Sequence, residues 1–369
     1  MKIAIVADWL PTYGGAEHVL SALVSVWPSA PIHTTVLRTP FPGPLPTGRV
    51  RTDSFLQTIF RVLGRHQILL PFMPRAIERI DLRGYDIVLS SSHAVGKGVI
   101  PPATSVHVCY CHTPMRYAWE MEAQYLKDFR VKGFLQKRAR RELKKLRRWD
   151  LSTAKRVDIF IANSSETQER IQRIYGRDSI VIPPPVEERF FVIPIVQTPT
   201  PTPYFLALGR LVPYKRFDLL IELANRLQFA LKIGGTGSEF ERLKAMAGPT
   251  VTFLGFVPDA DLPSLYTGAS ALFFPQHEDA GIVPMEAQAC GLPVIAYDKG
   301  GIRDVIKDGM SGVFASAQTI DAFASAVQRF QSIAWDRSAI REHARQFHIE
   351  KFTERMRDAV HRAQKNFHR

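Results

Sequence analysis

Two glutamates flank a glycine turn in the second half of the chain. Glu278 and Glu286 lie eight residues apart, with Gly281-Ile282 between them, directly after an apolar run that ends at Phe274. A glycine at a strand-to-helix turn exposes backbone N–H groups, and the N-terminus of the following helix favours anions. Carboxylates accept hydrogen bonds from hydroxyls, so the pattern predicts a sugar on one side of an anion site and a ribose on the other. Each glutamate taken alone is also compatible with an ordinary surface charge.

A pair of cations follows another apolar run, which starts at Tyr204. Arg210 and Lys215 lie five residues apart. A guanidinium and an ammonium together can neutralise a diphosphate and stabilise it as a leaving group without a metal. The alternative is a loop with ordinary surface cations. The nearby glycine loop 234–237 lacks the Lys-Ser/Thr of a P-loop, and we predict that its Gly235 lies near a substrate phosphate.

No metal site is predicted. Asp259-Ala260-Asp261 has the D-x-D form of some metal sites, but it precedes a helical pattern from Leu262, so helix capping is the favoured interpretation. Cys109 and Cys111 fall on one face of an expected strand, and no second pair of ligands follows them.

Two sheets are expected to position these residues. Short apolar runs alternate with helical patterns in both halves of the chain, which predicts α/β units with parallel strands covered on both faces. The expected strands are 2–7, 32–37, 86–90, 106–110, 158–162 and 179–182, and then 204–208, 230–233, 251–254, 271–274 and 294–296. Residues 321–369 contain no glycine or proline and have helical periodicity.

A proline cluster between residues 183 and 203 separates the two halves. Because proline at this density prevents helix and central strand, we expect a linker at 187–203 between domains at 1–186 and 204–345. The glycine turn at Gly14-Gly15, after the first strand, is typical of a Rossmann-like unit. The predicted fold is α/β, with two Rossmann-like domains facing each other across a ligand cleft.

Together these motifs resemble the retaining GT-B glycosyltransferases of family four, over essentially the whole chain. The matching elements are Glu278 and Glu286 at their spacing, Gly209-Arg210 with Lys215, the glycine turn followed by Ala16-Glu17, and Ala-Asn-Ser at 162–164. Segments 90–94 and 111–117 resemble most the mannosyltransferases of O-antigen and exopolysaccharide assembly. The resemblance also implies that helices from about 346 to 369 complete the first domain.

In the second domain the resemblance implies a role for each matched position. Arg210 and Lys215 hold the diphosphate of a nucleotide sugar, and Glu286 binds the ribose hydroxyls. Glu278 and the amides of Gly281-Ile282 face the donor sugar and its phosphate. Ala280 departs from the family, in which many members have an aromatic residue at this position.

In the first domain, His112 is implied to lie beside the donor sugar, and Gly14 and Gly15 to let the backbone approach donor and acceptor. The expected catalytic residues are thus His112, Glu278, Arg210 and Lys215, and the expected donor-binding residues are Gly14, Gly15, Arg210, Lys215, Gly235, Gly281, Ile282 and Glu286.

The reaction that the resemblance implies is transfer of a hexose with retention at the anomeric carbon. The acceptor oxygen attacks on the face of the leaving diphosphate, which takes the proton, so neither a cofactor nor a metal is required. GDP-mannose is the favoured donor, a lipid-linked saccharide or polysaccharide of a bacterial surface glycan the favoured acceptor, and the new linkage α. The alternatives are a UDP-hexose transferase or a nucleotide-sugar epimerase of the same fold.

The 369 residues carry 48 Lys and Arg against 35 Asp and Glu, a net charge of +13. With 46% apolar and 22% charged residues, disordered and fibrous classes are excluded. No apolar run reaches the roughly 18 residues of a transmembrane helix, and the apolar start is too short for a signal peptide. Three cysteines are too few for a framework of disulfide bonds, as is typical of proteins in a reducing cytoplasm.

Most of the excess charge lies in one segment. Residues Arg130 to Arg156 contain twelve Lys and Arg but two acids, a local charge of +10. An apolar stripe at helical spacing runs through the segment, namely Val131, Leu135, Ala139, Leu143, Leu146 and Trp149. A basic amphipathic helix predicts contact with an anionic membrane surface, and the alternative is that the stripe packs on the protein's own core.

A second segment, 55–73, is rich in bulky apolar residues interspersed with Arg61 and Arg65 and favours the membrane interpretation. We therefore expect a cytoplasmic protein that is peripheral on the inner face of the plasma membrane. A nucleic-acid-binding protein is a disfavoured alternative, because segment 130–156 contains only Phe134 and Trp149 as aromatic residues.

Overall fold

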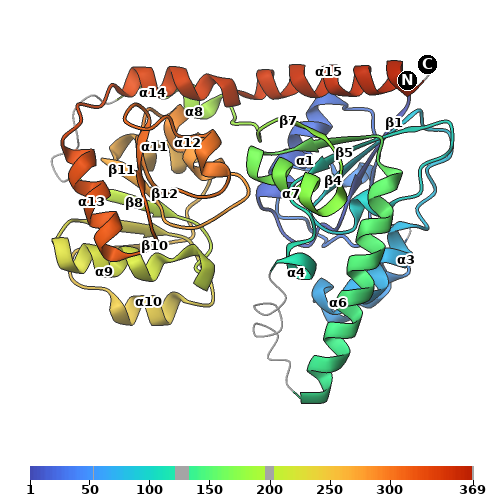
Figure 1. Cartoon of the computed structure of the whole chain (residues 1–369), viewed down its shortest axis with the longest axis horizontal. Helices are drawn as coiled ribbons and strands as arrows, with labels where there is room; N and C mark the ends of the chain where they lie inside the picture. Colours follow the sequence, from blue (N-terminus) through green and yellow to red (C-terminus); the bar gives the residue numbers. More distant parts are fainter. Residues whose placement is uncertain (53, 121–132, 196–202, 368–369) are drawn as a thin grey trace. The chain divides into compact units, whose positions relative to one another are not determined.

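Parallel β-sheets form the centre of both halves of the chain (Figure 1). The structure, a computed structural model, describes residues 1–52, 54–120, 133–195 and 203–367. The chain divides into two units, which are Met1–Pro183 with Phe352–Arg369 and then Pro184–Lys351. Each unit alternates strands and helices, as the sequence predicts.

In the described residues, the first unit has a sheet with the strand order β3-β2-β1-β4-β5-β6-β7, and every neighbouring pair is parallel. All residues of β1, β4 and β5 are buried, as expected for central strands covered on both faces. The strands are β1 (Ile3–Ala7), β2 (Ile32–Thr34), β3 (Val50–Arg51), β4 (Ile87–Ser92), β5 (Val106–Cys111), β6 (Ile159–Ala162) and β7 (Ser179–Val181). The sequence analysis missed β3, because two residues are too short to show a periodic pattern.

Helices of the first unit cover this sheet. They are α1 (Gly15–Val26), α2 (Leu56–Leu63), α3 (Met73–Ile77), α4 (Arg116–Trp119), α6 (Gly133–Thr153), α7 (Ser165–Tyr175) and most of α15 (Ile349–Phe367). The last helix joins this unit because it buries Phe352, Met356 and Val360 at helical spacing, with the Phe352 ring 5.9 Å from the ring of Tyr110 in β5.

The second unit has the strand order β10-β9-β8-β11-β12-β13 in its described residues, again parallel throughout. Its strands are β8 (Phe205–Leu208), β9 (Leu231–Gly234), β10 (Val251–Gly255), β11 (Ala271–Phe274), β12 (Val294–Tyr297) and β13 (Gly312–Ala315), the last of which was not predicted. Its helices are α8 (Arg189–Val192), α9 (Phe217–Leu227), α10 (Phe240–Met246), α11 (Leu262–Gly268), α12 (Ile282–Ala289), α13 (Ile320–Gln331), α14 (Arg337–Ala344) and the start of α15.

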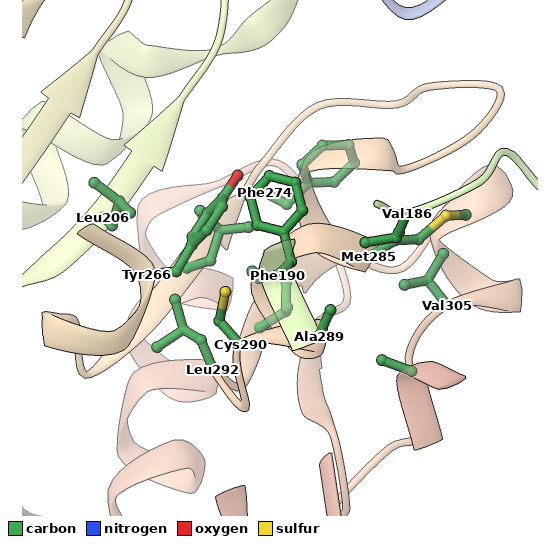
Figure 2. Close-up of a cluster of buried hydrophobic side chains, with 14 of the residues drawn as sticks. Val186, Phe190, Leu206, Tyr266, Phe274, Met285, Ala289, Cys290, Leu292 and Val305 are labelled. Atoms are coloured by element: carbon green, nitrogen blue, oxygen red, sulfur yellow. The ribbon is translucent and has the colours of Figure 1, made fainter. Parts of the chain in front are cut away.

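Two hydrophobic clusters lie on opposite faces of this second sheet. Alternate strand residues such as Leu206 and Phe274 join one cluster with helices α8, α11, α12 and α14 (Figure 2). Their neighbours, such as Ala207 and Phe273, join the other cluster with α9, α10 and α13. This alternation follows from the period-2 geometry of strands and holds the strand ends rigidly at the edge of the sheet.

The predicted linker 187–203 is wrong in its first part. Helix α8 lies within it, and its Phe190 and Phe191 are buried in the cluster of Figure 2. Backbone hydrogen bonds from the Val186 N–H to Phe347 O (2.8 Å) and from the Ile349 N–H to Val186 O (3.0 Å) extend the second unit at both ends. The prolines flank this short apolar segment, which packs in spite of them. Residues 196–202 lie outside the described residues.

The predicted helical stretch 321–369 is interrupted. Helix α13 ends at Gln331, and α14 begins only after Asp336, whose carboxylate accepts hydrogen bonds from the Ser338 and Ala339 N–H groups at 2.9 and 3.0 Å. Such a cap starts a new helix with its own direction. Periodicity alone does not locate this break, since helix caps need neither glycine nor proline.

Helix α6 carries the basic segment, and the second half of its apolar stripe faces the core. Leu143 and Leu146 are buried beneath the first sheet, with Trp149 packed against the same cluster. Asp150, also buried, forms an ion pair of 2.9 Å with Lys97. Packing on the protein's own core is therefore confirmed for this part. Val131 and the side chain of Leu135 lie outside the described residues.

Candidate active site

The strand order of the second unit reverses between β8 and β11. In sequence the strands run outward from β8 through β9 to β10 on one side, and from β11 to β13 on the other. Open parallel sheets bind ligands outside the carboxyl ends of the strands at such a switch point. Arg210 and Lys215 follow β8, and Glu278 follows β11, so the fold brings them to this place.

Lys215 and Glu278 form an ion pair at the switch point. The Lys215 Nζ lies 2.5 Å from the Glu278 Oε1, and both side chains are largely shielded from solvent. Lys215 ends a short 3-10 helix, Pro213–Lys215, and Arg216 after it has a φ of 55° that turns the chain into α9. A cation and a hydrogen-bond-accepting carboxylate are thus held side by side, as a diphosphate joined to a sugar requires.

The glycines of this site allow neighbouring backbone segments to approach each other closely. The Gly209 N–H donates to Gly234 O at the end of β9 (3.0 Å), and the Leu211 N–H donates to Thr236 O (2.9 Å), which joins the loops after β8 and β9. A Cβ on Gly235 would lie 1.9 Å from Gly209 O, and its φ of +135° is one that other residues avoid. Gly235 is therefore required for the position of the loop that carries Arg210.

Arg210 is exposed. Its Nη2 lies 3.5 Å from the Tyr214 hydroxyl, and no ion pair involves its guanidinium within the residues described. Its charge is therefore available to an anionic ligand.

Helix α12 begins at Ile282, with buried Gly281 as its N-cap residue. The N–H groups of Ile282 and Val283 lie in the first helical turn, where the helix itself offers no acceptors. Gly281 has no side chain to cap them, and a Cβ there would meet Ile302 and Pro284 at 3.3 Å. The helix start remains a site for an anion.

Glu286 lies one turn further along α12 and is buried. Its Oε2 accepts a hydrogen bond of 3.0 Å from the Tyr266 hydroxyl of α11. Burial raises the pKa of Glu286 to about 8, although this hydrogen bond and the charge of Arg189 oppose the shift. The sequence analysis did not single out Tyr266, because a tyrosine in an apolar helix is usually only a core residue.

The remaining predicted residues lie in the first unit. Gly14 is the N-cap residue of α1, and Gly15 is its first residue. His112 directly follows β5, and its Nε2 lies 2.9 Å from the Ser91 hydroxyl. Burial, assisted by the charge of His93, lowers the pKa of His112 to about 3, so its imidazole is neutral. Its backbone oxygen accepts a hydrogen bond of 2.9 Å from Asn163, which explains the 162–164 motif.

Two further polar residues, Asp8 and His93, directly follow β1 and β4. The strand order of the first unit reverses between these two strands. The sequence analysis assigned neither residue to the site, although His93 lies in the segment 90–94 that resembles mannosyltransferases and both residues follow predicted strands.

The D-x-D segment has structural contacts. Asp259 pairs with Arg189 at 3.6 Å, and Asp261 is the N-cap residue of α11, as predicted, although its side chain makes no capping hydrogen bond. Among the described residues, no three His, Cys, Asp or Glu side chains gather as ligands for a metal ion.

Two family models match successive parts of the chain. Residues 13–190 match the model described as Glycosyltransferase Family 4, and residues 188–347 match Glycosyl transferases group 1. The two matches meet beside α8, where the chain passes into the second unit.

Curated relatives are similar over part of the chain. A D-inositol 3-phosphate glycosyltransferase of Geodermatophilus obscurus is 30% identical over 203 residues, which are 47% of this chain and 45% of the relative. A GDP-mannose-dependent alpha-(1-6)-phosphatidylinositol monomannoside mannosyltransferase of Mycolicibacterium smegmatis is 35% identical over 143 residues, 34% of this chain and 37% of the relative. The chain thus spans less than half the length of these two relatives.

Solved structures match over almost the full length. Sucrose-phosphate synthase from Thermosynechococcus elongatus has a TM-score of 0.72 at 18% identity, covering 98% of this chain and 99% of the other. Anabaena HepE, solved in complex with UDP, has a TM-score of 0.67 at 18% identity with the same coverage. These matches confirm the predicted architecture of two Rossmann-like domains. Residues 13–190 are therefore similar to Glycosyltransferase Family 4 and residues 188–347 to the group 1 glycosyltransferases, and the chain has the GT-B fold.

Proposed function

We propose that the protein is a glycosyltransferase that moves a hexose from a nucleotide sugar onto a saccharide acceptor. The observation that carries this proposal is the Lys215–Glu278 ion pair at the switch point of the second sheet, near the exposed Arg210. The two family matches support the reaction class.

The donor would bind by its charge and its hydroxyls. Arg210 and Lys215 neutralise the diphosphate, and the first amides of α12 at Gly281-Ile282 donate hydrogen bonds to its oxygens. Glu278 accepts hydrogen bonds from the donor sugar, and Glu286 accepts them from the ribose.

In the proposed reaction, the bond between the anomeric carbon and the diphosphate oxygen breaks while the acceptor oxygen bonds to that carbon. The acceptor proton passes to the leaving diphosphate, and the α configuration is retained. Arg210 and Lys215 stabilise the charge that develops on the leaving group, a role that charged donors fulfil without a metal ion. His112, with its neutral imidazole, donates or accepts a hydrogen bond at the donor sugar.

GDP-mannose is the proposed donor. The Mycolicibacterium smegmatis relative is named for dependence on GDP-mannose, and segments 90–94 and 111–117 resemble mannosyltransferases. A UDP-sugar is the alternative, since Anabaena HepE has the same fold and was solved with UDP. The proposed acceptor is a lipid-linked saccharide or a polysaccharide of a surface glycan.

Release of the nucleoside diphosphate distinguishes these donors. The full chain is incubated with GDP-mannose or UDP-glucose, each with and without octyl α-mannoside as acceptor. We expect GDP release that depends on the acceptor, and an α-linked product by NMR. Release from UDP-glucose but not from GDP-mannose would replace the donor, and conversion of UDP-glucose into an epimeric UDP-sugar without net UDP release would favour an epimerase.

We also propose that the first unit contacts an anionic membrane. Six large apolar side chains of 55–72 are exposed, among them Val62 (83%) and Phe72 (57%). Arg61 and Arg65 lie exposed between them in sequence, and the exposed Arg75 follows. Helix α6 adds exposed cations, including Lys137, Lys144 and Lys145. Exposed apolar groups interspersed with cations are typical of surfaces that rest on anionic lipid. Within the described residues, no helix has the length and apolarity needed to cross a bilayer.

Flotation with liposomes tests this contact. Binding to phosphatidylglycerol-containing vesicles is expected to exceed binding to pure phosphatidylcholine, and the Val62→Asp/Phe72→Asp variant should lose it. Phe256→Asp is the control, because the exposure of Phe256 (74%) lies between those of Val62 and Phe72 but Phe256 belongs to the second unit. Equal flotation with both vesicle types would refute the proposal.

A further inference from the structure

The switch point of the first sheet has its own charged pair. Asp8 is the first residue after β1, and His93 is the first residue after β4. The Asp8 Oδ2 lies 2.9 Å from the His93 Nδ1. Strands β1 and β4 are the two between which the strand order of this unit reverses. The pair therefore lies where an open parallel sheet binds a ligand, as Lys215 and Glu278 do in the second unit.

Asp8 is fully committed to protein contacts. It is buried, and its carboxylate accepts hydrogen bonds from the N–H groups of His93 (2.7 Å), Val95 (2.6 Å) and Gly96, and from the Ser92 hydroxyl (3.1 Å). Burial raises the pKa of Asp8, but the charge and hydrogen bonds of His93 and the Gly96 N–H outweigh it and lower the pKa to about 2. Asp8 is thus a fixed anion that orients the imidazole.

His93 instead has a free side. Its Nδ1 faces Asp8, its side chain is 27% exposed, and its Nε2 has no hydrogen-bond partner in the part of the chain that the structure describes. The rings of Trp9 (4.9 Å) and His112 (6.2 Å) meet it edge-on and limit its rotation. A ring held at Nδ1 and open at Nε2 is arranged to donate one directed hydrogen bond.

The charges around His93 favour a neutral ligand. Asp8 cancels the imidazolium charge, and the neutral His112 adds none. The charge of Glu17 of α1 also acts on His93. His66, whose pKa burial lowers to about 4, contacts the Trp9 ring at 5.1 Å in a tilted arrangement. Without a net positive charge, a hydroxyl is a better partner than a phosphate.

We propose that His93, oriented by Asp8, is an acceptor-binding residue whose Nε2–H donates a hydrogen bond to a hydroxyl oxygen of the acceptor saccharide. The inference rests on the proposed function, in which the switch point of the second unit holds the donor and leaves that of the first unit for the other substrate. His93 is the group that touches the acceptor, and Asp8 is a positioning residue.

Protonation of His93 predicts a pH dependence of acceptor binding that a purely structural role of this residue would not produce. Burial lowers the pKa of His93, but the charge and hydrogen bond of Asp8 and the charge of Glu17 outweigh it and raise the pKa above its ordinary value of 6.5. The donating imidazolium is present below this raised pKa and is lost as the pH rises through it. Affinity for the acceptor should therefore fall with rising pH in the wild-type protein, and this dependence should be absent in His93→Gln.

The test measures octyl α-mannoside binding by calorimetry and transfer kinetics with GDP-mannose. We expect His93→Gln to weaken acceptor binding and raise the acceptor KM about tenfold or more, while the donor KM and slow donor hydrolysis without acceptor stay unchanged. The matched control is His361→Gln, because His361 is exposed on α15 of the same unit. Thermal unfolding of both variants checks that they fold like the wild type.

Three outcomes would overturn the proposal. One is acceptor binding that is equal in His93→Gln and wild type, another is an equal loss of donor and acceptor binding, and the third is wild-type protein that does not bind the mannoside. The first two leave the proposed glycosyltransferase function intact, whereas failure of the wild type to turn over any nucleotide sugar would refute that function itself.

Discussion

The ammonium group of Lys215 lies 2.5 Å from the carboxylate of Glu278, so two motifs from distant parts of the sequence form one ion pair. The pair exists because β8 and β11 are neighbours in the sheet although two strands lie between them in sequence. Without a ligand, each side chain neutralises the other, and a bound diphosphate would compete with Glu278 for the ammonium.

Replacing Lys215 with methionine is expected to lower kcat by about 10²–10³-fold, because a charged donor to the leaving group is lost from a shielded site. Glu278→Gln should also reduce turnover, and the double variant should lose less than the two losses combined, since the residues act as a unit. Steady-state rates of nucleoside diphosphate release measure this. Lys244→Met is the matched control, because Lys244 is exposed on α10 of the same unit. Wild-type turnover in both single variants would show that the site is assigned wrongly.

Glu286 should make the second unit less stable as the pH rises. Because burial raises its pKa from 4.5 to about 8, the folded protein keeps a proton that the unfolded chain releases between these values. The stabilisation is complete below the unfolded pKa and is lost as the pH rises through the folded one, with a size on the order of 2–4 kcal/mol. Urea unfolding of wild type and Glu286→Gln near pH 5 and near pH 8 measures it. The stability of the variant relative to wild type should increase with pH, and parallel profiles would contradict the raised pKa.

The buried ion pair between Lys97 and Asp150 of α6 should contribute far more to the free energy of unfolding than an exposed ion pair on the same helix. Lys97 donates to Asp150 O (2.6 Å) and to the Thr153 hydroxyl (2.7 Å) as well as pairing with the Asp150 carboxylate. Lys97→Met leaves a buried carboxylate unpaired and should lower the free energy of unfolding by about 3–5 kcal/mol. Lys145→Met removes the exposed pair with Glu142 and should change it by less than about 1 kcal/mol. Denaturant unfolding compares the two, and similar losses would show that Lys97 does not anchor α6.

Gly235→Ala should weaken donor binding through the loop that carries Arg210. The new Cβ would lie 1.9 Å from Gly209 O, so one loop must move, and the left-handed φ adds strain. Gly255→Ala is the control, because Gly255 also has a positive φ (+69°) but a Cβ there meets no atom within 4 Å. Thermal unfolding should show strain in both variants, whereas calorimetry with GDP-mannose should show loss of affinity only for Gly235→Ala. Equal affinities would mean that the contact between the two loops is not needed for donor binding.

Much of the fold was predictable because it follows from local patterns of apolar residues in the sequence. Short apolar runs located the central strands, such as 106–110 and 271–274, and both are found close to the predicted limits. Proline content misplaced the linker, since it said nothing of Phe190 and Phe191, which the second core buries. The basic segment was predicted with two alternatives, and the burial of Leu143 and Leu146 shows that the second half of its apolar stripe packs on the core.

The sequence by itself determined which residue types were available for chemistry and, through strand and turn patterns, that they follow strands. Glu278, Arg210 and Lys215 were recognisable in this way because spacing along one chain is a local property. Which of them meet was decided by the order of strands in each sheet, which places β8 beside β11 and β1 beside β4. The Lys215–Glu278 and Asp8–His93 pairs, and the burial that shifts the pKa of Glu286 and His112, arise from contacts between segments far apart in sequence. Such contacts depend on tertiary packing, because they form only once the strands are aligned and water is excluded around them.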